Sequence, residues 1–215
     1  MALARYYVAE GFGSEALGVL GLIAEQDETA AANPQFRVAR ALANLQMGRY
    51  RDALNDLSME ALGLDQDAAL WRGLAAAGAR DWHQARNNLM TAQKIIGHYP
   101  AVWQARADVT LARAALELDE PSSAMQAISL VPRTPLPADI AAEAMLVRAD
   151  LEQLSSKADT ALELYQQVTT SPYKPAAMRA SLEETLLKQK LGKIKPEEAI
   201  DALERLRFQW RGDDV

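Results

Sequence analysis

A short pattern of one alanine and one or two large apolar residues recurs six times along this 215-residue chain. In each copy a turn precedes the alanine, and a large apolar residue stands four positions after it, often with another directly beside the alanine. These positions share one side of a helix, where the small alanine allows a neighbouring helix to approach closely. Repetition at intervals of 32 to 39 residues indicates stacked supersecondary units. The alanines are Ala16, Ala53, Ala85, Ala124, Ala161 and Ala199.

Each alanine-centred segment is predicted to be the second helix of a hairpin. First helices are predicted over residues 2–10, 34–47, 68–79, 100–118, 138–154 and 175–191, and four of their starts lie at or just after a proline. Ser14, Ser122 and Asp159 are expected to cap second helices. We therefore predict an all-α chain of six hairpins and about twelve helices, without a β-sheet. The expected hairpin turns lie at Gly11, Gly48, Arg80-Asp81, Asp119-Glu120, Ser155-Ser156 and Gly192.

Composition agrees with helix and excludes several classes of protein. Alanine and leucine dominate the apolar half of the chain, and both favour helix. The net charge of −6 argues against a general nucleic-acid binder, and the absence of cysteine excludes disulfides, thiol nucleophiles and cysteine-ligated metals. The longest apolar run, residues 16–24, is too short to span a bilayer, so no membrane insertion is expected. No export signal is visible, which leaves the cytoplasm and the periplasm both open.

Several segments resemble the tetratricopeptide repeat, a helix–turn–helix unit. The segment 48–53, Gly-Arg-Tyr-Arg-Asp-Ala, is similar to the family's Gly-x-Tyr-x-x-Ala turn. Trp71 and Leu74 stand three apart as in the family's first helix, and Trp82 occupies the aromatic position of the following turn. Ala161 with Tyr165 resembles the alanine–aromatic pair of the second helix.

The resemblance implies a right-handed solenoid of about six repeats in one domain over residues 1–215. The proline-rich segment 131–137 is where we expect a bend. A solenoid of this kind holds a peptide or a partner's helix in a concave groove lined by first helices. A protein-binding scaffold of a bacterial-type assembly or regulatory protein is therefore the leading hypothesis, and the chain is expected to be a fragment of a longer protein.

Arginines of the first helices are the predicted partner-binding residues. Arg40, Arg72 and Arg148 each lie 13 residues before the alanine of their repeat, and Arg113 lies 11 before its own. A row of guanidinium groups suits the carboxylates of a bound segment, since each offers a planar fork of donors. Ion pairs between helices are the alternative role. Two further residues of the predicted first helices complete the set, Asn44 and Arg106.

The two ends of the chain are predicted interfaces. A solenoid buries each hairpin only against its neighbours, so the outer faces of the terminal hairpins are normally polar. Here Tyr6 and Tyr7 stand at one end, and Phe208 and Trp210 stand at the other. Self-association through terminal hairpins, or stacking on flanking domains, is therefore the second hypothesis.

Catalytic motifs have little support. The segment 11–16 matches the glycine pattern of dinucleotide-binding turns, but no strand pattern follows it, so a hairpin turn is the better interpretation. His83 and His98 are the only histidines, and neither has a second ligand at helical spacing. We expect no catalytic residue, cofactor or metal site, and an all-α enzyme is the weakest hypothesis.

Overall fold

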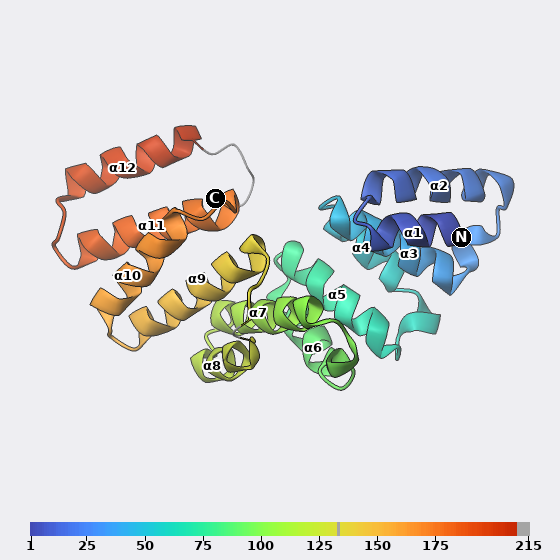
Figure 1. Ribbon diagram of the computed structural model, residues 1–215, viewed down its shortest axis with the longest axis horizontal. Helices are drawn as coiled ribbons and strands as arrows, with labels where there is room; N and C mark the ends of the chain where they lie inside the picture. Colours follow the sequence, from blue (N-terminus) through green and yellow to red (C-terminus); the bar gives the residue numbers. More distant parts are fainter. Residues whose placement is uncertain (133, 210–215) are drawn as a thin grey trace. The chain divides into compact units, whose positions relative to one another are not determined.

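The computed structural model describes residues 1–132 and 134–209, and all the regular secondary structure in these residues is helical (Figure 1). Twelve α-helices and three short 3-10 helices account for it, with no strand in the described part. The predictions of an all-α chain, of about twelve helices and of no β-sheet are confirmed for these residues.

The helices alternate as first and second members of six hairpins. Every first helix begins within two residues of its predicted start and ends within one residue of its predicted end. The first helices are α1 (Ala2–Ala9), α3 (Pro34–Gln46), α5 (Gln66–Gly78), α7 (Ala101–Glu117), α9 (Ala138–Leu154) and α11 (Lys174–Lys190). The second helices are α2 (Gly13–Gln26), α4 (Tyr50–Leu57), α6 (Trp82–Ala92), α8 (Pro121–Leu130), α10 (Ala158–Thr169) and α12 (Pro196–Gln209). Three 3-10 helices lie between hairpins, Ala30–Ala32, Glu60–Leu62 and Ile96–His98.

The three predicted helix caps are wrong. Because α2, α8 and α10 each begin two residues earlier than expected, Ser14, Ser122 and Asp159 lie inside their first turns. The hydroxyl of Ser14 donates to Glu15 instead. Side-chain caps occur at other helices, where a carboxylate or amide oxygen accepts backbone N–H groups of the first turn. These caps are Asn33, Asp65 and Asp81.

All six hairpin turns share one backbone geometry despite their different sequences. Each contains one residue with positive φ, and the backbone N–H of the next residue donates to the carbonyl oxygen five residues before it, at 2.8–2.9 Å. This is the six-to-one bond of the Schellman motif, which satisfies a carbonyl at the helix end. The residues with positive φ are Gly11, Gly48, Arg80, Asp119, Ser156 and Gly192, so the six turns lie where the sequence predicts them.

The repeat alanines form the contacts between paired helices. Five of the six are fully buried, and Ala199 is 5 % exposed. Close approach also explains Gly73 of α5, where an added Cβ would lie 2.6 Å from Cγ of Leu89 in α6. Gly78 is similar, because an added Cβ would lie 2.4 Å from the ring of Tyr50 in the preceding hairpin. Small residues thus set the packing distance both within and between hairpins.

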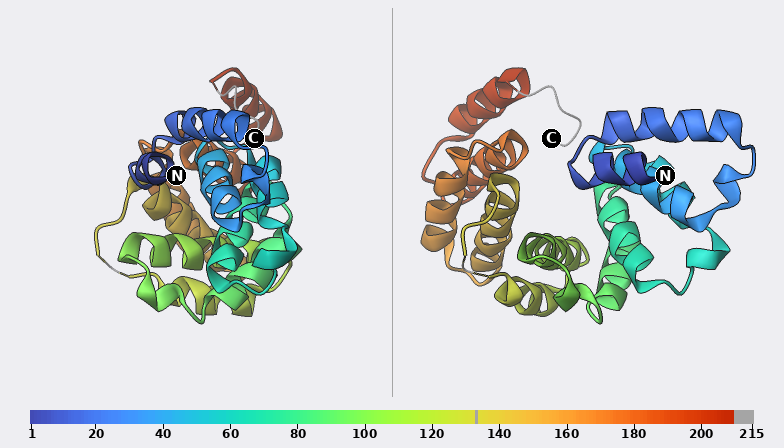
Figure 2. Two further views of the ribbon diagram at one scale, coloured as in Figure 1. Left: turned by 90° about the vertical axis from the view of Figure 1, so that its right-hand side faces the viewer. Right: turned by 45° about the vertical axis from the view of Figure 1, so that its right-hand side comes forward.

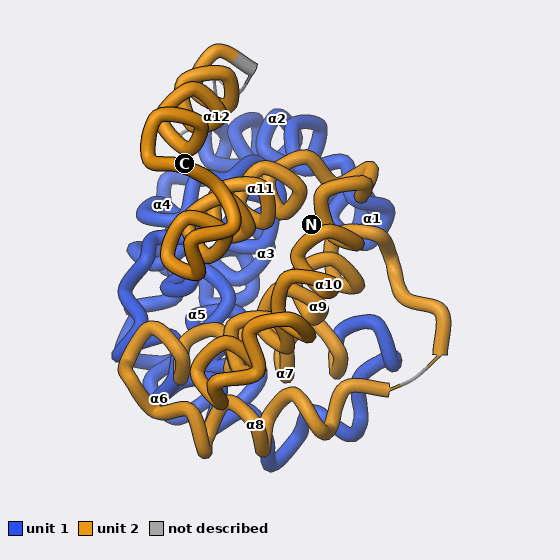
Figure 3. Tube along the Cα trace, turned by 90° about the vertical axis from the view of Figure 1, so that its left-hand side faces the viewer, with its two compact units in different colours: residues 1–103 blue, residues 104–215 orange. Residues whose placement is uncertain are grey.

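The chain divides into two compact units, Met1–Trp103 and Gln104–Val215, and the division falls inside α7 (Figure 3). In the first unit each helix from α1 to α6 packs on the next, and α1 also packs on α3 and α3 on α5 (Figure 2). In the second unit α8 to α12 pack in succession, and α9 also packs on α11. One apolar cluster of this unit joins side chains from α7, α8 and α9.

Two further predictions concern the proline-rich segment and membrane insertion. Residues 131–137 link α8 to α9 without helix in their described part, and a bend there stays a prediction. Within the described residues, no helix combines the length and the apolar character that crossing a membrane requires.

Candidate interaction site on the first helices

Two arginines of the first unit, Arg40 and Arg72, each bond a side chain in the second helix of their own hairpin. Arg40 of α3 donates to both carboxylate oxygens of Asp56 in α4, at 2.8 and 2.5 Å. The side chain of Asp56 is only 5 % exposed. This hydrogen bond raises the pKa of Arg40 above its ordinary value, so the guanidinium stays charged. Arg40 therefore acts as an interhelical tie.

Arg72 holds the equivalent place one hairpin later. Its Nε donates to the side-chain oxygen of Asn88 in α6 at 3.1 Å. Its other nitrogens donate to the backbone carbonyl of Leu57, the last residue of α4, and to those of Leu62 and Gly63 in the connection before α5. Burial lowers the pKa of Arg72. In both hairpins the partner lies 16 residues after the arginine, which shows that the common spacing from the repeat alanine corresponds to a common structural role.

Arg148 shares that spacing but not that role. The residue 16 positions after it is Leu164, which cannot accept a hydrogen bond. Arg148 is exposed on α9, and no described residue bonds its side chain. Of the three arginines predicted from spacing, Arg148 is thus the one left available to a partner. Asn44 is buried in α3 and is not available in this conformation.

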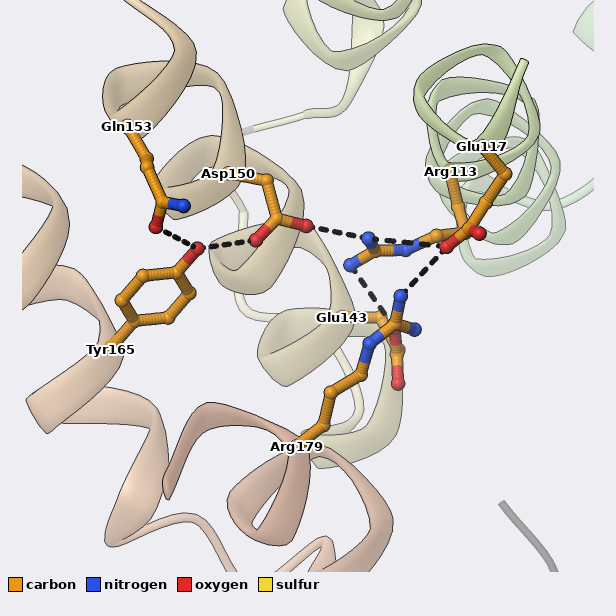
Figure 4. A network of polar contacts seen from close by, with 7 residues as sticks. All are labelled: Arg113, Glu117, Glu143, Asp150, Gln153, Tyr165 and Arg179. Carbon is orange, nitrogen blue, oxygen red and sulfur yellow. Dashed lines mark hydrogen bonds and ion pairs between the residues drawn. The ribbon is translucent and has the colours of Figure 1, made fainter. Parts of the chain in front are cut away.

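Arg113 of α7 is the centre of a polar network in the second unit (Figure 4). Its side chain is 8 % exposed, and Nη1 lies 2.5 Å from a carboxylate oxygen of Asp150 in α9. Two further carboxylates stand at longer range, Glu117 at 3.9 Å and Glu143 at 4.0 Å. The buried Nε and Nη2 atoms form no hydrogen bond. Arg113 therefore ties α7 to α9 rather than pairing within its own hairpin.

The network extends from Asp150 into α10 and from Glu117 to α11. Tyr165 of α10 donates its hydroxyl proton to Asp150 at 2.6 Å, and the hydroxyl oxygen lies 3.2 Å from Gln153 Oε1. Burial, reinforced by the charge of Asp150, raises the pKa of Tyr165. Arg179 of α11 donates to Glu117 at 2.8 Å (Figure 4). One set of charges thus connects three successive first helices.

Two more charged groups lie on these helices. Arg106 of α7 pairs with Asp139 of α9 at 2.6 Å, which adds a second α7–α9 tie. Glu183 of α11 is half-buried, and burial together with the negative charge of Asp150 raises its pKa. Binding of partners by Arg106 and Arg113 stays a prediction, and in this structure both are engaged within the chain.

The network partners were missed by sequence analysis, although the sequence contains a signal for them. Arg113 lies 11 residues before Ala124, and Asp150 lies 11 residues before Ala161. Equivalent positions of successive hairpins become neighbours when hairpins stack, so opposite charges there predict an ion pair. Tyr165 was interpreted only as an apolar contact, and its hydroxyl bond to Asp150 was not anticipated.

The predicted end-interface residues and the two histidines differ in exposure. Tyr6 is 58 % exposed, Tyr7 is half-buried and Phe208 is 74 % exposed. Trp210 lies outside the described residues. His83 and His98 are exposed, and the described residues contain no group of three or more potential metal ligands.

A hollow of about 580 Å³ lies between α8 and the end of α9. Its walls are serine, glutamine, proline and apolar side chains, among them the exposed Met125 and Leu154. None of the lining side chains titrates near neutral pH, so this hollow offers no acid–base chemistry.

Comparison of the sequence with models of known protein families and with curated proteins gave no match.

Proposed function

We propose that this chain is a tetratricopeptide-like helical scaffold that binds a peptide or helix of a partner protein on the face formed by its first helices. The observation that supports this most is the packing of alternate helices on one another, α1 on α3, α3 on α5 and α9 on α11. Stacking of hairpins places first helices side by side, and such a row forms an extended surface suited to a bound segment.

The common geometry of the turns and of the hairpin contacts also supports a repeat architecture. Five turns place the residue of positive φ five positions before the repeat alanine, and the sixth places it seven before. Tyr50, the aromatic residue of the Gly-x-Tyr turn, lies against Gly78 of the next hairpin. Both residues flank a hairpin turn, and contact between successive hairpins is what a stacked repeat requires.

Within this proposal the arginines divide into two groups. Arg40, Arg72 and Arg113 hold helices together, so their contribution to binding is to fix the surface. Arg148 is exposed on a first helix and is the residue we assign to direct contact with a carboxylate of the partner. Arginine suits this contact because its planar guanidinium offers paired donors to both carboxylate oxygens.

Affinity capture with matched variants tests the proposal. The parent chain, Arg148→Glu and Arg51→Glu are immobilised and exposed to lysate of the source organism, and captured proteins are quantified by mass spectrometry. Arg51 is an exposed arginine of the second helix α4, so its reversal controls for the change in net charge. We expect Arg148→Glu to lose captured partners that Arg51→Glu retains. Identical capture by all three chains would contradict a first-helix binding surface.

Self-association is a second candidate function, favoured by exposed apolar side chains at both ends of the described chain. Phe12 and Leu22 of the first hairpin are 50 % and 60 % exposed, and Ile200 and Phe208 of the last are 57 % and 74 % exposed. Light scattering over a hundredfold range of concentration tests this function. A constant monomer mass would remove it.

A further inference from the structure

We propose that the first hairpin carries a docking patch for an arginine-containing basic segment of a partner protein. The patch consists of Tyr6, Tyr7 and Phe12, at the end of α1 and in the turn that leads to α2. The ring centroids of Tyr6 and Tyr7 lie 5.9 Å apart, and those of Tyr7 and Phe12 lie 6.4 Å apart with edge-to-face geometry. Because Tyr6 and Phe12 are at least half exposed, this is a continuous aromatic surface open to solvent.

A second aromatic group in the same unit has a structural role, and it differs from the patch in burial and in hydrogen bonding. Trp71, Tyr99 and Trp103 also make edge-to-face contacts, with centroids 4.9 and 6.0 Å apart. All three are at least partly buried, and the Tyr99 hydroxyl donates to Asp67. No described residue bonds the hydroxyls of Tyr6 and Tyr7, so the exposed patch lacks the internal polar contacts of the buried group.

Two carboxylates flank the turn of the patch, and the first hairpin as a whole is acidic. Residues 1–33 contain five acidic side chains and one basic side chain, Arg5. Arg5 is held by Gln35 of α3 at 2.5 Å. Glu10 directly follows α1, and Glu15 lies in the first turn of α2, so both are within three residues of Phe12. The Ser14 hydroxyl donates to Glu15 and lowers the pKa of that carboxyl, which keeps it ionised.

Exposed rings beside carboxylates are complementary to a guanidinium group. The face of an aromatic ring attracts a cation, and arginine can also stack flat on it while pairing with a carboxylate. A second copy of the same patch is disfavoured, because the carboxylates of Glu10 and Glu15 would then face like charges. The occupant is therefore a basic segment of a different protein. This patch is separate from Arg148, so it goes beyond the scaffold function and is tested independently of it.

Nuclear magnetic resonance with defined peptides tests the patch. The probes are the capped peptide Arg-Ala-Arg-Ala-Arg and its counterpart with citrulline, which has nearly the shape of arginine without the charge. We expect the arginine peptide to shift amide signals of α1 and of the α1–α2 turn, while the citrulline peptide leaves them in place. Phe12→Ala should weaken binding about 3- to 10-fold. Glu10→Gln with Glu15→Gln should weaken it and reduce its salt dependence.

The control variant is Leu22→Ala, which removes an equally exposed apolar side chain from the same hairpin without changing its charge. It should bind the arginine peptide as the parent does. The proposal is overturned if the citrulline peptide binds equally well, or if the shifted signals spread over acidic residues of all helices. It is also overturned if the patch signals shift with protein concentration alone, because the occupant would then be a second copy.

Discussion

The two units use arginine in different ways. In the first unit Arg40 and Arg72 reach partners 16 residues later, in the second helix of the same hairpin. In the second unit Arg113 and Arg179 reach partners 37 and 62 residues away, on other first helices. The ion pair of Arg40 stabilises a single hairpin, whereas those of Arg113 and Arg179 couple successive hairpins. We therefore expect loss of Arg40 to act locally and loss of Arg113 to act across several helices.

The largest effect is expected from Arg113→Ala. Removal of the guanidinium leaves Asp150 without its cation in a partly buried network, and such losses cost about 3–5 kcal/mol. Hydrogen exchange should rise in α7, α9 and α10 together, because the network spans these helices. Arg148→Ala is the control on the same face and should change stability by less than about 0.5 kcal/mol. Equal effects of the two changes would contradict the assigned roles.

Arg40→Ala is expected to have a smaller and more local effect, about 2–3 kcal/mol. The change strands the buried carboxylate of Asp56, but Arg40 is itself one-third exposed, which lets water reach the site. Faster hydrogen exchange should be confined to α3 and α4. Asp56→Ala, alone and combined with Arg40→Ala, completes a cycle that isolates the pair. Spread of the faster exchange into α7–α12 would remove the distinction between the units.

The sequence is informative about the helices and turns because these depend on local chemistry. Alanine spacing, proline at helix starts and turn-forming residues act over a few positions, which is why the first-helix boundaries were predicted to within two residues. The predicted caps are wrong because Ser14, Ser122 and Asp159 each lie two residues after the true N-cap, and a shift of this size turns a cap into a first-turn residue.

The polar network was harder to predict, because it depends on which hairpins become neighbours. Arg113 and Asp150 share a repeat position, and this could have indicated their pair. Arg148 shows that spacing from the repeat alanine does not by itself predict the role of an arginine. The residue 16 positions after Arg40 is an aspartate that pairs with it, whereas the residue 16 positions after Arg148 is a leucine. The function of an arginine therefore depends on a residue elsewhere in the hairpin.

The turns allow a test of whether the shared geometry extends across both units. Gly48→Ala in the first unit should cost about 1–2 kcal/mol, because Cβ clashes with the backbone at positive φ. Ser156→Gly in the second unit should gain about 0.5–1 kcal/mol for the converse reason. Denaturant unfolding followed by circular dichroism measures both. Destabilisation by Ser156→Gly would show that the serine side chain has a role that the backbone geometry does not reveal.

The smallest effect is expected at Glu183, whose carboxyl has its pKa raised by burial and by the negative charge of Asp150. A carboxyl whose pKa is higher in the folded state than in the unfolded state binds its proton more tightly when folded. The stability that it contributes is present below its unfolded pKa, near 4.3, and is lost as pH rises through the folded pKa. At neutral pH, ionised Glu183 therefore opposes folding of the second unit.

Glu183→Gln should consequently stabilise the protein at pH 7, by less than about 1 kcal/mol because the side chain is partly solvated. The gain should diminish as pH falls through the folded pKa and disappear well below the unfolded pKa, where the parent carboxyl is protonated in both states. Glu184→Gln is the matched control, since the neighbouring Glu184 pairs with Lys188 at 2.6 Å and should lose stability or stay unchanged at pH 7. Melting temperatures of both variants and the parent, measured from pH 3 to 8, test this pH dependence. A pH-independent gain for Glu183→Gln would mean that charge at this position does not couple to folding, and that the network of the second unit ends at Arg179.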